Sequence, residues 1–188
     1  MSPRQVAGAH LRVSGGEVGG RRLEAPRGIR PTQGMVREAI FNVVGPLLAD
    51  ATVIDLFAGS GALGIEALSR GAARATFVDQ DDQSVRAIRR NLEELALAGR
   101  ARVARADVTR WLRTNPEEVR GASLVLLDPP YNDAVLEHAL ALLDPLVAAG
   151  ATVVVEHAHR QPLRDRDRLR PVRERRYGDT SVTVLVAE

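Results

Sequence analysis

Short apolar runs alternate with amphipathic stretches from residue 51 onward. The runs predict β-strands over residues 52–56, 75–78, 102–106, 124–127 and 152–156. After Asp81, apolar side chains recur at steps of three and four residues: Val85, Ile88, Leu92 and Leu95 form the apolar face of a predicted helix, and Arg86, Arg89, Arg90 and Glu93 point outward. Strands that alternate with helices indicate an α/β fold whose parallel sheet is covered on both faces.

The two ends of the chain follow other patterns. Residues 10–13 and 18–23, separated by Ser14-Gly15-Gly16, predict a small β-hairpin. Residues 168–177 and 180–187 predict a terminal antiparallel hairpin around Gly178-Asp179. Thr32 is suited to cap a helix over residues 33–45. The apolar stripe of that helix consists of Met35, Val36, Ala39, Ile40 and Val43.

The composition is typical of one domain with one substantial core, since 45% of the 188 residues are apolar. No apolar run approaches the roughly 18–20 residues that cross a bilayer, and residues 1–13 lack the apolar stretch of a secretory signal. The lack of cysteine excludes disulfides and cysteine-based zinc sites. His157 and His159 alternate at a strand end, where a surface or loop position is favoured over metal binding. We therefore expect a soluble cytoplasmic monomer without a metal.

Charge divides the chain into three parts. The net charge is only +2, and all 26 basic residues are Arg, a usage that also fits a bias in genome composition. Residues 1–30 hold six Arg and two acids, residues 31–155 twelve Arg and sixteen acids, and residues 156–188 eight Arg and six acids. Basic ends around an acidic middle suit a catalytic core with extensions that hold phosphates. We expect a basic extension over residues 1–30 and a catalytic domain over residues 31–188.

A glycine-rich turn follows the first predicted strand, ahead of a helix that begins near Ala62. Gly59, Gly61 and Gly64 have the spacing of a dinucleotide-binding turn, which also fits a methyltransferase. Asp55, four residues before the first glycine, favours a cofactor with a positive amino group. A pyrophosphate would instead prefer unopposed N–H groups at a helix N-terminus.

Acids also end the next two predicted strands. Asp79 is placed to accept hydrogen bonds from two ribose hydroxyls, and Asp107 to meet an adenine amino group. Each acid has the alternative of a helix cap, Asp82 and Asp107 in particular. Three acids at one edge of a parallel sheet, where ligands bind, favour the cofactor interpretation.

The tetrapeptide Asp128-Pro129-Pro130-Tyr131 after the strand over residues 124–127 is the sharpest chemical signal. Because prolines fix the backbone and lack N–H groups, the Asp128 carboxylate and the Pro129 carbonyl can accept both hydrogens of an exocyclic amine. That contact frees the nitrogen lone pair for attack on a methyl group, and Asp128 can also take the departing proton. Tyr131 offers a face on which an extruded base stacks. The alternative is a rigid loop after a core strand.

With these motifs in place, the chain resembles the RsmD family of bacterial 16S rRNA (guanine-N2) methyltransferases. The resemblance runs nearly end to end and is carried by the segments 12–13, 20–23, 30–32, 36–42, 55–70, 128–131 and 177–180. It implies a Rossmann-like class I methyltransferase fold with a seven-stranded sheet, S-adenosylmethionine as cofactor and no metal. It also implies a substrate, the guanine at position 966 of the reference rRNA, in the assembled or assembling small ribosomal subunit.

The resemblance also implies roles for further residues. The turn residues Phe57, Ala58 and Ser60, together with Gln80, would contact the cofactor, and Thr32, Arg37 and Asn42 would line the cofactor or base pocket. From the residues alone, Arg37 would lie on an exposed helix face. The basic extension would hold RNA through Arg12, Arg21, Arg22, Arg27 and Arg30, in salt-sensitive backbone contacts. Tyr131 replaces a frequent Phe of the family, and Asp79 a frequent Glu.

Other functions fit part of the pattern. An adenine-N6 or other amino methyltransferase that acts on DNA or a different RNA would use the same tetrapeptide. A nicotinamide-dependent oxidoreductase would use the glycine turn, but it gives residues 128–131 no role. An RNA-binding module without enzymatic activity needs no cofactor pocket.

Overall fold

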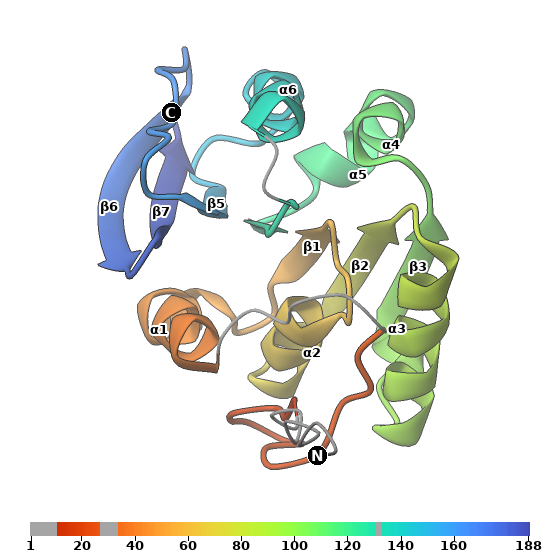
Figure 1. Cartoon of the computed structure of the whole chain (residues 1–188). Coiled ribbons are helices and arrows are strands. Elements are labelled where there is room, and N and C mark those ends of the chain that lie inside the picture. Colours follow the sequence, from red (N-terminus) through yellow and green to blue (C-terminus); the bar gives the residue numbers. More distant parts are fainter. Residues whose placement is uncertain (1–10, 27–33, 131–132) are drawn as a thin grey trace, which may run out of the picture.

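A seven-stranded sheet in the order β3-β2-β1-β4-β5-β7-β6 forms the centre of the molecule (Figure 1). The computed structural model describes residues 11–26, 34–130 and 133–188. The strands are β1 Thr52–Leu56, β2 Arg74–Asp79, β3 Ala101–Arg105, β4 Leu124–Leu127, β5 Thr152–Ala158, β6 Leu169–Tyr177 and β7 Thr180–Ala187. Strands β1 to β5 are parallel, and β7 runs antiparallel to both β5 and β6. The five predicted strands and the terminal hairpin are thereby confirmed.

Helices cover both faces of the sheet (Figure 1). One face carries α1 Gly34–Val44, α2 Ala62–Ser69 and α3 Asp82–Glu94, and the other carries α4 Val108–Thr114, α5 Pro116–Arg120 and α6 Asp133–Leu143. Short 3₁₀ turns lie at Gly45–Leu47 (η1) and Ala98–Arg100 (η2). Val53 of β1 belongs to the apolar cluster of the first face, and Ile54 and Leu56 to that of the second. Because both faces are buried, the central strands are apolar nearly throughout.

The predicted buried face agrees with the structure in α3 but only in part in α1. In α3 the apolar residues Val85, Ile88 and Leu92 are buried and the predicted charged residues are exposed, as expected. In α1 the predicted stripe is correct in part: Val36 and Ile40 are buried, but Met35 is 71% exposed. The buried residues of α1 are Val36, Arg37, Ile40, Phe41 and Val44. Apolar side chains surround most of this helix, so spacing alone does not select the face that packs. The predicted cap Thr32 lies outside the described residues.

The N-terminal segment, residues 11–26, pairs with itself in an antiparallel sense but forms only one bridge, between Arg12 and Arg22. Val13 N–H donates to Arg21 O at 3.0 Å, and Leu23 N–H to Leu11 O at 2.8 Å. The predicted second strand begins too early, because residues 16–21 form successive turns. The apolar side chains of this segment pack into the same cluster as α1, α2 and α3.

His157 contradicts the prediction of a surface position. It lies in β5, is 6% exposed, and its Nε2 lies 2.9 Å from the Thr183 hydroxyl of β7. The hydroxyl and nearby carbonyls give the imidazole polar partners inside the sheet. Among the helices of the described residues, none has the length and apolar character needed to span a membrane.

Candidate active site

The carboxyl edge of the sheet, defined here as the edge where β1 to β5 end, carries the predicted site. β1 leads into a tightly curled turn in which Phe57, Gly59 and Gly61 have φ values of 60°, 55° and 76°. The Ala58 N–H donates to Val78 O of β2 at 3.2 Å, which ties the turn to the neighbouring strand. Gly61 is the N-cap of α2. The turn therefore presents curved main chain at the end of β1.

Gly64 permits α2 to pack closely on β2. A Cβ atom at this position would lie 2.3 Å from Cε1 of Phe77 and 3.0 Å from Oδ2 of Asp55. Phe77 is fully buried and cannot withdraw. The third glycine of the spacing is thus required for helix–strand contact, as the sequence motif predicts.

Asp55 lies beneath the turn rather than beside an open pocket. It is 1% exposed, and its Oδ2 accepts a hydrogen bond from Gly64 N–H at 2.8 Å. Burial raises the pKa of this carboxyl well above its ordinary value, the Gly64 hydrogen bond opposes that shift, and the charges of Asp128 and Asp79 add to it. Asp55 therefore supports the turn from within the protein, and its part in binding a cofactor with a positive amino group stays a prediction.

Asp79, at the end of β2, organises the turn from the side. Its Oδ2 accepts from Gly59 N–H at 2.8 Å, and its Oδ1 from Asp81 N–H at 2.9 Å. The carboxylate is partly exposed, so it faces both the turn and the solvent. Gln80, the next residue, is exposed in a bend. Asp79 therefore joins the ends of β1 and β2 at one point.

Two of the acids that follow strands act as helix caps. Asp81 caps α3 by accepting from Ser84 N–H at 2.8 Å. Asp107 caps α4 through its Oδ1, which accepts from the Thr109 hydroxyl at 2.7 Å and from Arg110 N–H at 2.9 Å. The Thr109 hydroxyl and then the Arg110 N–H hold the pKa of Asp107 below its ordinary value. Asp82 is no cap; it lies inside α3 and pairs with Arg86 and Arg105.

The acid-proline corner, residues 128–130, leaves β4 directly beside the glycine turn. Leu127 of β4 is in register with Leu56 of β1, so Asp128 and Phe57 follow paired residues of neighbouring strands. The charge of Asp128 contributes to the raised pKa of Asp55, which reflects the same proximity. Pro129 is partly exposed and Pro130 exposed. Tyr131 lies outside the described residues.

Asn91, which the sequence interpretation missed, joins the N-terminal segment to the glycine turn. It is 1% exposed on α3; its Oδ1 accepts from Glu24 N–H at 2.8 Å, and its Nδ2 donates to Glu24 O at 2.9 Å and to Ser60 O at 3.1 Å. Both N–H groups and the oxygen of the amide are thus bonded to backbone. A polar residue beside Leu92, on the apolar face of an amphipathic helix, was the available signal.

Arg37 does not lie on the exposed helix face that the residues alone predicted, and its place in the cofactor or base pocket stays a prediction. It is 4% exposed, its Nη2 donates to Arg12 O, and its Nε lies 3.5 Å from Glu66. Glu66 is fully buried on α2 and accepts at 2.7 Å from Ser14 N–H, from the Ser14 hydroxyl and from Arg70 Nε. Because a buried charge needs partners, this cluster fastens α1 and the N-terminal segment to α2.

The remaining predicted residues are scattered. Asn42 is exposed on α1, whereas Arg27, Arg30 and Thr32 lie outside the described residues. Arg12, Arg21 and Arg22 are exposed on the N-terminal segment. The first two of these side chains donate to Gly20 O at 2.7 Å and to Glu94 O at 3.1 Å, respectively.

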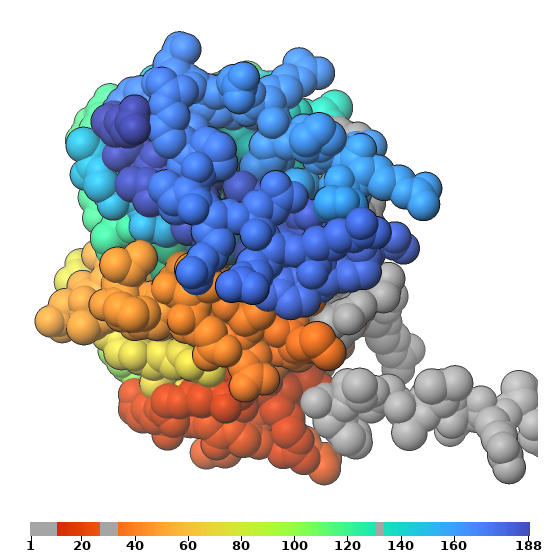
Figure 2. All heavy atoms as spheres, turned by 90° about the vertical axis from the view of Figure 1, so that its left-hand side faces the viewer, coloured from red at the N-terminus to blue at the C-terminus, as the bar shows by residue number. Residues whose placement is uncertain are grey.

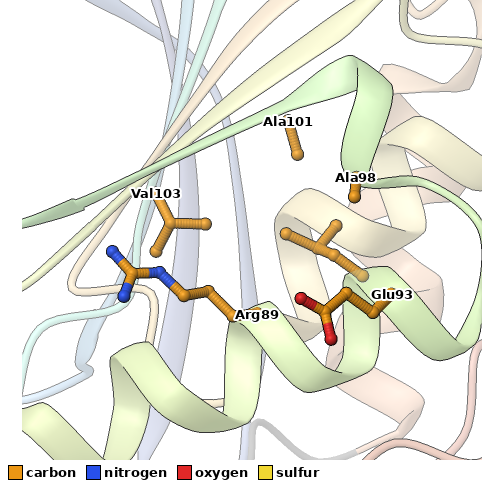
Figure 3. Close-up of a pocket in the computed structure, with 6 residues that line it drawn as sticks. Arg89, Glu93, Ala98, Ala101 and Val103 are labelled. Atoms are coloured by element: carbon orange, nitrogen blue, oxygen red, sulfur yellow. The ribbon is translucent and has the colours of Figure 1, made fainter.

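A separate pocket of about 210 Å³ lies between α3 and β3, lined by Arg89, Leu92, Glu93, Ala98, Ala101 and Val103 (Figure 3). Its strand residues come from the beginning of β3, whereas Asp107 follows the end of that strand. The pocket is therefore at the opposite end of β3 from the carboxyl edge, and we assign no part of a reaction to it.

Known proteins share this fold. The solved structure of yhhF from Escherichia coli superposes with a TM-score of 0.86 at 33% identity, covering 96% of this chain and 99% of that one. An RNA methyltransferase from Salinibacter ruber, solved with S-adenosyl-L-homocysteine, shares the fold at a TM-score of 0.62 and 20% identity, over 85% of this chain and 95% of that one. The sheet, the glycine turn and the corner at the end of β4 thus define a class I methyltransferase fold.

The sequence comparisons identify the family. The model of the family described as conserved hypothetical protein 95 matches residues 11–186, and the chain belongs to this family. It is the RsmD family that the sequence resembled. Ribosomal RNA small subunit methyltransferase D of Escherichia coli (strain K12) is 39% identical over 144 residues, 76% of this chain and 71% of that protein.

Proposed function

We propose that this protein transfers a methyl group from S-adenosylmethionine to the exocyclic N2 of a guanine in 16S rRNA. The observation that carries the proposal is the register of β4 with β1, which brings the acid-proline corner beside the glycine turn. A family relative named for small-subunit rRNA methylation supports the substrate class. The same proposal includes the small subunit or its assembly intermediate as partner, guanine 966 of the reference rRNA as target, and action as a monomer in the cytoplasm.

The charge of the site fits a cationic cofactor. Asp55, Asp79 and Asp128 lie close enough for two of them to raise the pKa of the third. A sulfonium with an amino group relieves that repulsion, whereas the pyrophosphate of a nicotinamide cofactor would increase it. The curled turn, whose third glycine packs against Phe77, follows the end of β1, and Phe57 and Gly59 within it are partly exposed. This electrostatic match favours a methyltransferase over the oxidoreductase alternative.

The residues of the corner would handle the target amine. S-adenosylmethionine, when bound, supplies an electrophilic methyl group on sulfur. The Asp128 carboxylate and the Pro129 carbonyl accept the two amino hydrogens, which fixes the nitrogen and turns its lone pair toward the methyl group. Asp128 then takes the proton that the nitrogen releases. Tyr131 would stack on the extruded base.

The remaining cofactor contacts are assigned by position. Asp79, at the tip of β2, would hold the ribose hydroxyls, and the exposed Gln80 lies next to it. Asp107 would meet the adenine through Oδ2, since its two cap hydrogen bonds use Oδ1. Phe57, Ala58 and Ser60 would contact the cofactor as part of the turn. Arg12, Arg21, Arg22, Arg27 and Arg30 would contact the rRNA backbone.

A methyl-transfer assay tests the proposal. Labelled S-adenosylmethionine is offered with small ribosomal subunits from cells that lack the gene, with deproteinised 16S rRNA and with DNA. We expect label in 16S rRNA, alone or within the subunit, and N2-methylguanosine after digestion to nucleosides. Label in DNA, or in N6-methyladenosine, would support the alternative amino methyltransferase and overturn the proposal.

A further inference from the structure

Strand β6 is the most openly basic element of the described structure. Residues 170–176 are all exposed, and five of these seven are charged: Arg170, Arg173, Glu174, Arg175 and Arg176. β6 is an edge strand that pairs with β7 alone. Figure 2 shows this part of the chain, in blue, spread over the same face of the molecule as α1 and the N-terminal segment.

The end of β6 lies at the carboxyl edge. Ala158, the last residue of β5, pairs with Thr180, the first residue of β7, and Thr180 pairs with Tyr177, the last residue of β6. Because β5 is parallel to β4, the turn at Gly178-Asp179 is on the same edge as the acid-proline corner. Three strand spacings separate β4 from β6, which amounts to about 14 Å. Nucleotides next to a base held at Asp128 can cross that span.

Two arginines of β6 are available to such a ligand. Arg173 and Arg175 pair in register with Val184 and Val182, whose side chains belong to the apolar cluster on the α1 face. Both arginines therefore point to the α1 side of the sheet. Neither guanidinium has a hydrogen-bond or ion-pair partner within the residues that the structure describes. Arg176, by contrast, donates from Nε to Gly178 O at 2.7 Å and fastens the turn.

Protection of an exposed edge does not account for this pattern. Charges and prolines commonly prevent edge strands from pairing with other chains. Pro171 and the irregular register between Pro171 and Arg173 already interrupt β6 in its first half. The three arginines of residues 173–176 are instead gathered in the half that approaches the carboxyl edge.

We propose that Arg173 and Arg175 form a second phosphate-binding surface, which holds the rRNA backbone beside the target base. The inference rests on the proposed function and extends it, because it adds the β6 end of the site to the N-terminal arginines. The partner is the sugar-phosphate backbone of RNA, so the contacts carry charge and position but little sequence information.

A pair of matched double variants tests the inference. The variant R173Q/R175Q removes the guanidinium groups of Arg173 and Arg175 from β6. The control R74Q/R89Q removes two other exposed arginines, one at the start of β2 and one on α3, both away from the carboxyl edge. The KM for small ribosomal subunits and kcat are measured between 50 and 200 mM salt (about the range over which phosphate contacts weaken) at fixed Mg²⁺. The KM for S-adenosylmethionine and the thermal midpoint are recorded for each protein.

We expect R173Q/R175Q to raise the KM for small subunits several-fold and to leave kcat nearly unchanged. The slope of log KM against the logarithm of the salt concentration should decrease by about 1.4–1.8. The KM for S-adenosylmethionine and the thermal midpoint should match those of the wild type.

The inference is overturned if R173Q/R175Q follows the control in KM and slope. If the wild type modifies no RNA, it is the proposed function that fails. A lowered midpoint would call for R173K/R175K, which keeps both charges and should restore the wild-type salt slope; a reduced slope in that variant would overturn the inference.

Discussion

At the scale of single residues, the carboxylates of Asp55, Asp79 and Asp128 gather where β1, β2 and β4 end. Two of them hold backbone N–H groups of the glycine turn and of the start of α2. The charged form of Asp55 is destabilised, because Asp55 is buried and the charges of Asp79 and Asp128 lie near it. Its charge is thus unfavourable for the fold but favourable for a cationic ligand, an arrangement common at functional sites.

Asp55→Asn tests this view of the residue through pH. Because the pKa of Asp55 is raised in the folded protein, its contribution to stability is complete below the ordinary carboxyl pKa and is lost as pH rises through the raised value. Asparagine keeps an acceptor for Gly64 N–H and does not titrate. The unfolding free energy of the wild type relative to the variant should therefore fall as the pH rises above the ordinary carboxyl pKa of about 4. Urea unfolding across pH measures this difference.

Asp165→Asn removes one charge on the exposed loop before β6 and serves as the control. At neutral pH, Asp55→Asn should also bind S-adenosylmethionine more weakly than the wild type, as calorimetry would detect. Parallel pH profiles for the wild type and Asp55→Asn would contradict the assigned burial of this charge.

At the scale of elements, the contact between α2 and β2 depends on the glycine turn. Gly64→Ala would place a methyl group against the Phe77 ring, and neither the helix nor the ring has room to move. We expect a loss of about 1–3 kcal/mol in unfolding free energy, measured by chemical denaturation. Gly99→Ala is the matched control, because its Cβ would meet no atom within 4 Å. Its effect should stay within about 0.5 kcal/mol.

A second variant separates the clash from a loss of backbone freedom. The double variant Gly64→Ala/Phe77→Leu should lose less unfolding free energy than the sum of the losses in the two single variants. The reason is that leucine leaves space where the edge of the Phe77 ring would meet the new methyl group. Strict additivity of the two single effects would show that the predicted contact is not the cause.

Strands that consist of one continuous apolar run could be predicted well. The strands over residues 52–56 and 124–127 are apolar throughout and bounded by turns, and both were placed with their correct ends. The α1 face was not, because Met35 and Phe41 are both apolar and only the packed structure decides which is buried. The early start of the second N-terminal strand has a similar cause, since turns occupy residues 16–21.

At the scale of the whole molecule, long-range contacts assemble the site. The glycine spacing and the tetrapeptide could be read from the chain, because each is local. The contacts of Asn91 with Glu24 and Ser60, and those of Glu66 with Ser14 and Arg37, arise only when the N-terminal segment, α1, α2, α3 and the glycine turn pack together. Sequence periodicity carries no information about such pairs, which explains why Arg37 was misplaced.

The chain order also separates the two halves of the reaction. The glycine turn follows β1 and the acid-proline corner follows β4, about 70 residues apart, and only the strand order makes them neighbours. We therefore expect that a change in the acid-proline corner can abolish methyl transfer while the cofactor site of the same molecule still binds S-adenosylmethionine.

Asp128→Ala provides the most direct measurement of that claim. The rate of methyl transfer to small ribosomal subunits is measured in a single turnover, and the affinity for S-adenosylmethionine by calorimetry on the same preparation. We expect no detectable transfer, with an affinity for S-adenosylmethionine within a few-fold of that of the wild type. Methyl transfer at a rate near that of the wild type would contradict the role given to the corner.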